Sequence, residues 1–108
     1  MQVKDLIERE GKVVTLKRIK EEPTDWTDQP IYEEVQTKAI IRECNTTERE
    51  ILAGIETSEL LTLILYEAVD IRDVVIIDDI EYEVVYRERV FVKDKVLYYK
   101  AIVSRGSL

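Results

Sequence analysis

The sequence predicts an all-β protein, a small antiparallel β-barrel of about six strands with one or two short helices. Three observations lead to this fold class. The 108 residues and the 45% hydrophobic content suit a single domain with one modest core. From residue 57 onward, short segments rich in β-formers alternate with turn residues. So many strands in so short a chain would expose unpaired edges unless the sheet closes on itself.

Each element has its own signal. An amphipathic pattern over residues 3–10, ended by Gly11, predicts a helix so short that it must dock on the rest of the chain or on a neighbouring molecule. Alternating apolar residues predict strands over residues 12–20, 32–44, 60–66, 73–77, 80–92 and 96–103. Asp78-Asp79 is a candidate two-residue hairpin turn, and residues 93–95 form the next turn. In the strand over 80–92, one face is expected to carry Ile80, Tyr82, Val84 and Tyr86.

Two segments interrupt the strand pattern. Residues 21–30 hold turn formers and Trp26, which either covers one end of the core or anchors a partner. Residues 45–57 form an insertion with a capping-box pattern, Thr47-Glu48-Arg49-Glu50, that predicts one or two helical turns. We expect residues 1–108 to be one domain, with the helix over 3–10, the barrel over 12–104 and a mobile insertion over 45–57.

Composition argues against several chemistries. Without histidine the chain has no Ser-His-Asp triad, no Cys-His pair and no imidazole metal site. One cysteine cannot build a structural zinc site, and we expect Cys44 to be a small buried hydrophobe. Three scattered glycines form no phosphate-binding loop. We therefore expect no catalytic residues, no cofactor and no metal, and the chain is not predicted to be an enzyme.

Two clusters of side chains each allow two interpretations. The carboxylates between Asp70 and Glu83 are typical of a solvated strand face, with a weak cation site as the alternative. The tyrosines of the last two strands are typical of cross-strand aromatic pairs, with base stacking as the alternative. No segment is apolar for the roughly 20 residues of a membrane helix, and residues 1–10 carry too many charges for a signal peptide.

Charge is segregated along the chain. The net charge is −7 overall, with basic ends over residues 1–20 and 84–108 and a strongly acidic stretch over 21–83. This balance argues against a sequence-specific nucleic-acid binder, which would present a basic face. The segments are either solvated faces or a bipolar surface that favours head-to-tail self-association. On the second interpretation, the candidate subunit interface includes Trp26, Arg87 and Arg89.

The second half of the chain carries a family pattern. In the run VDIRDVVIIDDIEYEVV over residues 69–85, Asp73 opens a short apolar strand, a tight turn follows, and Tyr82 and Val84 begin the next strand. The last strand, YYKAIVSR, ends at Arg105. This pattern resembles the phage head–tail joining proteins, also called head-closure, stopper or adaptor proteins. The likeness extends loosely from residue 12 to residue 105, although Asp78-Asp79 stands where the family more commonly has a glycine-containing turn.

The resemblance implies a β-barrel subunit that forms a homo-oligomeric ring around the DNA channel, between the portal or adaptor protein and the tail proteins. It implies a place in the virion, and in the host cytoplasm before assembly, without catalysis. In stopper members a loop projects into the channel. By position the corresponding residues are Thr46, Thr47, Glu48, Arg49, Glu50, Ile51 and Leu52. The alternative function is a small non-viral β-barrel protein-interaction module, with a small enzyme as the third candidate.

Overall fold

The computed structural model describes residues 3–21, 31–45, 48 and 59–105. Its elements are α1 (Val3–Glu10), β1 (Lys12–Glu21), β2 (Ile31–Glu43), β3 (Leu60–Leu65), β4 (Val74–Ile77), β5 (Ile80–Val92) and β6 (Lys95–Ser104). The strands pair antiparallel in the order β1-β2-β3-β6-β5-β4, and β4 pairs back onto β1 to close a barrel. The predicted fold class is therefore confirmed, and every strand begins and ends close to its predicted range.

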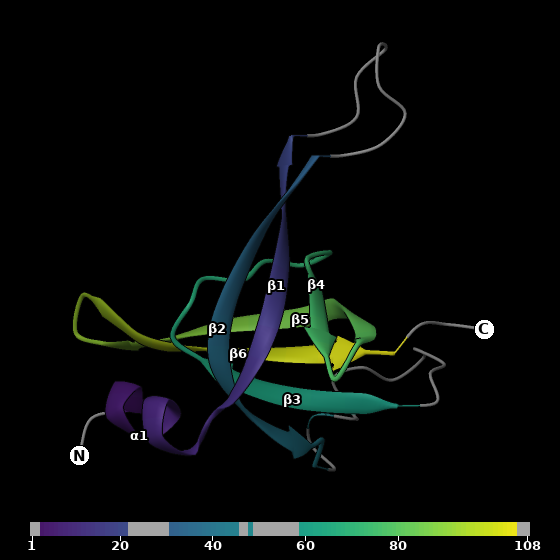
Figure 1. Cartoon of the computed structure of the whole chain (residues 1–108). Coiled ribbons are helices and arrows are strands. Elements are labelled where there is room, and N and C mark those ends of the chain that lie inside the picture. Colours follow the sequence, from purple (N-terminus) through teal and green to yellow (C-terminus); the bar gives the residue numbers. More distant parts are fainter. Residues whose placement is uncertain (1–2, 22–30, 46–47, 49–58, 106–108) are drawn as a thin grey trace.

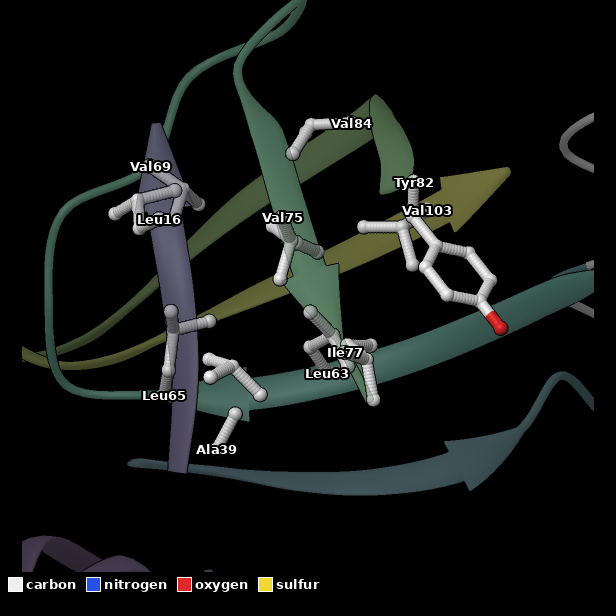
Figure 2. Close-up of a cluster of buried hydrophobic side chains, with 12 residues drawn as sticks. Leu16, Ala39, Leu63, Leu65, Val69, Val75, Ile77, Tyr82, Val84 and Val103 are labelled. Atoms are coloured by element: carbon white, nitrogen blue, oxygen red, sulfur yellow. The ribbon is translucent and has the colours of Figure 1, made fainter. Parts of the chain in front are cut away.

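Inward-facing side chains of all six strands fill the barrel (Figure 2). Alternation places Val14 and Leu16 of β1 inside, opposite Val75 of β4, and all three are at most 2% exposed. Val69, from the loop between β3 and β4, packs into the same cluster next to Leu16. In the described part of the chain, packed side chains thus fill the barrel interior.

A β-bulge in β5 changes which side chains face the core. Val84 pairs with Val103, and Tyr86 pairs with Ile102, so Val85 is the extra residue. The prediction that Tyr86 shares a face with Tyr82 and Val84 is wrong for this reason. Val84 lies in the core, whereas Tyr86 packs against a second cluster on the outer wall of the barrel. Beyond the bulge, it is Arg87 that pairs with the buried Ala101.

The turn between β4 and β5 requires a left-handed backbone at two consecutive positions. Asp78 has φ 51° and Asp79 has φ 67°, and Ile77 pairs with Ile80 on either side of them. This is the type I′ geometry whose twist matches that of the flanking strands. Aspartate tolerates the left-handed region better than most residues do, which is why the turn forms without glycine.

Helix α1 docks where β1 begins. Ile7 is 2% exposed, and the Gly11 amide donates to the Ile7 carbonyl at 2.8 Å, which ends the helix. A Cβ on Gly11 would lie 2.3 Å from that carbonyl oxygen and 3.1 Å from the Lys38 Cβ. The Lys38 ammonium also donates to the Glu8 carbonyl at 2.8 Å. The Ile7 carbonyl therefore requires a glycine at this junction, the contact with Lys38 on β2 is also tight, and the docking of the helix on the rest of the chain is confirmed.

Asp79→Gly is expected to stabilise the protein. Glycine adopts a positive φ without steric cost, so the free energy of unfolding should rise by about 0.5–1 kcal/mol, or a Tm increase of about 2–8 °C. The matched control is Asp94→Gly in the β5–β6 turn, because Asp94 is not among the residues with positive φ. Thermal unfolding of both variants tests this, and a stabilisation equal in the two would contradict the turn geometry.

Candidate functional site

Two pairs of strands continue beyond the barrel as two-stranded ribbons (Figure 1). Strand β1 pairs with β4 only at Thr15–Lys17, and β3 pairs with β6 only at residues 99–104. Past these limits, residues 18–21 and 31–33 form the β1–β2 ribbon, and residues 90–92 and 95–98 form the β5–β6 ribbon. The two ribbons leave the barrel in different directions (Figure 1). The ribbons carry exposed apolar residues: Tyr32 is 42% exposed, Phe91 50% and Val92 55%.

An arginine pocket of about 270 Å³ lies at the base of the ribbons and is lined by Arg18, Arg87, Arg89 and Tyr99, among others. Arg18 continues the inward alternation of Val14 and Leu16 past the rim of the barrel. Arg87 and Arg89 pair with Ala101 and Tyr99 and so share their inward face. The bulge at Val85 therefore brings two of the predicted interface residues together with a third arginine.

Arg18 and Arg87 each lie near a carboxylate, and Arg89 lies over an aromatic ring. The Arg18 guanidinium lies 3.1 Å from Glu67, and its buried Nε has no hydrogen-bond partner in the described part of the chain. Arg87 lies 3.7 Å from Asp70, a carboxylate that is 73% exposed. Arg89 stacks over the Phe91 ring, 5.5 Å from its centroid. Guanidinium groups arranged this way can bind a carboxylate of another protein, because each presents several hydrogen-bond donors in a fixed plane.

Asp73 holds the loop that closes this pocket. Its carboxylate accepts the Asp70 amide at 2.8 Å, and its carbonyl accepts the Val84 amide at 2.8 Å. Asp73 is 4% exposed, and burial raises the pKa of its carboxyl group. The aspartate that opens β4 thus has a structural role, since it joins the β3–β4 loop to β5.

Glu48, predicted to lie in a projecting loop, is a buried anchor on the outer wall of the barrel. It is 1% exposed and receives two hydrogen bonds from the Arg42 guanidinium, both at 2.8 Å. The Lys100 ammonium lies 2.7 Å from the same carboxylate, and the Thr62 hydroxyl donates at 3.1 Å. Strands β2, β3 and β6 therefore each contribute one group to a single carboxylate. These hydrogen bonds, that of Arg42 above all, hold the pKa of Glu48 well below its usual range.

The backbone around Glu48 forms a capping box with Asn45. The Asn45 amide donates to Glu48 Oε1, and the Glu48 amide donates to Asn45 Oδ1, both at 2.8 Å. This reciprocal pair begins two residues before the predicted Thr47–Glu50 pattern. Below it, Cys44, Leu60 and Ile102 form a second apolar cluster on the outer wall. The expectation that Cys44 is buried is confirmed, since it is 8% exposed.

The remaining candidate residues lie outside the described part of the chain. They are Trp26, Thr46, Thr47, Arg49, Glu50, Ile51 and Leu52. The position of Arg18 beside Arg87 and Arg89 was not predicted, although its place two residues after Leu16 in an alternating strand marks it as inward-facing. Among the described residues, no three metal-ligating side chains converge on one point. No helix in that part of the chain has the length and apolar character to cross a membrane.

Glu48→Gln is expected to lower the free energy of unfolding by about 3 kcal/mol at neutral pH. Breaking a buried ion pair typically costs about 3–5 kcal/mol. The lower end applies because Arg42 and Lys100 are 40% and 25% exposed. Because the folded-state pKa is lowered, this stabilisation is present above the unfolded pKa and is lost as pH falls through and below about 4.5.

Denaturant unfolding at neutral pH and in this acid range measures the effect. The difference between wild type and Glu48→Gln should shrink as the pH falls. Glu10→Gln is the control, because its exposed partner Arg9 makes its ion pair worth less than about 1 kcal/mol. A Glu48→Gln loss no larger than that of the control would show that the anchor carries no stability.

Comparison with protein-family models gives no match to this chain, and comparison with curated proteins gives none either. The features of the chain that bear on its function lie on the surface of the barrel. That surface offers two projecting ribbons, an arginine pocket between their bases, and an outer wall fixed by Glu48.

Proposed function

We propose that this chain is a structural subunit of a phage or prophage connector, which joins the head portal to the tail as a ring around the DNA channel. The observation that carries the proposal is the pair of ribbons that leave the barrel in different directions. A ring needs two different patches on each subunit, because a head-to-tail contact repeats until it closes. One barrel with two unlike projections fits this requirement.

The charge distribution supports the same function. Residues 21–83 hold most of the carboxylates, and basic residues gather toward both ends of the sequence. An acidic channel wall repels phosphate, so DNA can pass without sticking. The basic residues of β5, Arg87 and Arg89, then serve protein contacts and not DNA binding. In this proposal the chain acts through assembly in the virion, and it resides in the host cytoplasm before that.

Reconstitution with the portal and tail proteins of the same genome tests the function. The purified chain, mixed with portal rings, should add a further ring that electron microscopy resolves on the portal axis. Tail protein should then bind only to portals that carry this ring. If the chain binds neither portal nor tail protein, the connector function is wrong, and the non-viral interaction module becomes the better proposal.

Reversing Arg87 and Arg89 to glutamate should weaken ring formation on the portal about tenfold, which corresponds to about 1.4 kcal/mol. Each reversal removes an attraction for a partner carboxylate and adds a repulsion. Because Asp70 and Asp73 lie beside the new charges, the neutral pair Arg87→Gln and Arg89→Gln is measured as well. Circular dichroism should show both variants folded.

The matched control reverses Arg72 and Arg105, which changes the net charge equally outside the arginine pocket. Portal binding is titrated for all variants under the same salt conditions. Equal weakening by the control pair would mean that net charge alone matters, and unchanged assembly of the Arg87 and Arg89 variants would show that the pocket is only a solvated surface.

A further inference from the structure

A groove of about 720 Å³ is lined by Lys4 of helix α1, by Tyr66 and by residues 92–97 of the β5–β6 ribbon. Its apolar lining includes Tyr66, Val96 and Leu97, and its rim carries Lys4, Lys93 and Lys95. The Lys4 ammonium lies 5.0 Å from the centroid of the Tyr66 ring. Asp94 is the acidic side chain among the lining residues, so the rim is net positive. The groove therefore suits an extended segment that brings both apolar and acidic side chains.

One wall of this groove is the free edge of β6. Pairing between β3 and β6 ends at Leu65 with Tyr99. Within the described residues, no strand pairs with residues 95–98 on that side. An unpaired edge presents a row of backbone donors and acceptors that another strand can complete.

A second free edge of opposite charge lies on β2. Strand β2 pairs with β3 only from Ala39 onward, so residues 31–38 have no strand partner on that side among the described residues. This stretch carries Glu33 and Glu34, both exposed, beside the exposed Tyr32. Glu34 stays 63% exposed although it lies 3.8 Å from Lys17. Thus β2 offers an acidic edge with an aromatic anchor, which complements the basic groove on β6.

We propose that the free edge of β2 in one copy docks in the groove along β6 of the next copy. The contact forms one four-stranded sheet, in the order β5-β6-β2-β1, across the two subunits. This inference names the subunit contact of the ring and rests on the function proposed above. A two-stranded ribbon is marginally stable alone, and three or more strands are needed for independent stability. Joining the ribbons therefore stabilises both of them.

Backbone and side-chain groups have different roles in this contact. Main-chain hydrogen bonds along β6 and burial of Tyr32 against Val96 and Leu97 supply the affinity. The lysines at the rim, facing Glu33 and Glu34, set the register and exclude a second β6 edge from the groove. Because the two edges differ, the contact is heterologous and can repeat from copy to copy.

Zero-length carbodiimide cross-linking of concentrated protein tests the contact directly, because it joins ammonium and carboxylate groups only when they touch. Unlabelled and ¹⁵N-labelled copies are mixed, so that mass spectrometry identifies links between subunits. Links from Lys93 or Lys95 to Glu33 or Glu34 are expected. Inter-subunit links confined to other positions, or no inter-subunit link at all, would overturn the contact.

Charge exchange supplies a second test. Lys93→Glu with Lys95→Glu forms one variant, and Glu33→Lys with Glu34→Lys forms the other. Each alone should associate about tenfold more weakly than wild type in sedimentation velocity. An equimolar mixture of the two, and the single chain with all four changes, should recover association. Recovery also shows that the variants fold, and failure to recover would overturn the pairing of these edges.

These measurements separate the contact from the connector function, because they use the chain without portal or tail proteins. If portal rings are decorated while the expected links are missing, the function stands and the contact is wrong. If the expected links form but the portal is not bound, the contact stands and the connector function is wrong.

Discussion

The architecture depends on the short strand that closes the barrel. Strand β4 has four residues, and it pairs with β1 at only three of them, Val74–Ile76. Closure removes the edges of the sheet near the core, where burial of Leu16 and Val75 stabilises it. The flanking strands are much longer, since β1 has 10 residues and β5 has 13. The part of β1 that β4 does not cover leaves the barrel in the β1–β2 ribbon, and the part of β6 beyond its last pair with β3 leaves it in the β5–β6 ribbon.

The outer wall is organised by a different interaction. Arg42, Thr62 and Ile102 occupy one cross-strand row on β2, β3 and β6, and all point away from the core. Thr62 and Ile102 are nevertheless fully buried. A lone buried carboxylate would be costly there, but Glu48 is paired with two cations and accepts further hydrogen bonds from neutral groups. The ion pairs of Glu48 therefore hold residue 48 against the outer wall of the barrel. The apolar cluster of Cys44, Leu60 and Ile102 next to it is buried from solvent.

Much of the fold could be predicted from the sequence because its signals are local. Alternation and turn residues defined the strands, and the helix over 3–10 ended at its glycine. The arginine pocket was not predictable in the same way. It depends on the bulge at Val85, and a one-residue shift in pairing is decided between strands. The adjacent apolar pair Val84-Val85 was the available local signal. The burial of Glu48 was not predicted, because its polar neighbours in sequence suggest exposure, whereas its partners come from three strands.

The bulge also links the interior of the barrel to its surface chemistry. Without the extra residue, Tyr86 would follow Val84 on the inner face, and Arg87 and Arg89 would face outward as part of an ordinary solvated strand. With it, Tyr86 packs on the outer cluster and the two arginines line the pocket beside Arg18. One inserted residue thus places an aromatic ring where the wall needs apolar contact. The same extra residue places Arg87 and Arg89 beside Arg18 at the base of the two ribbons, so these basic side chains form one pocket.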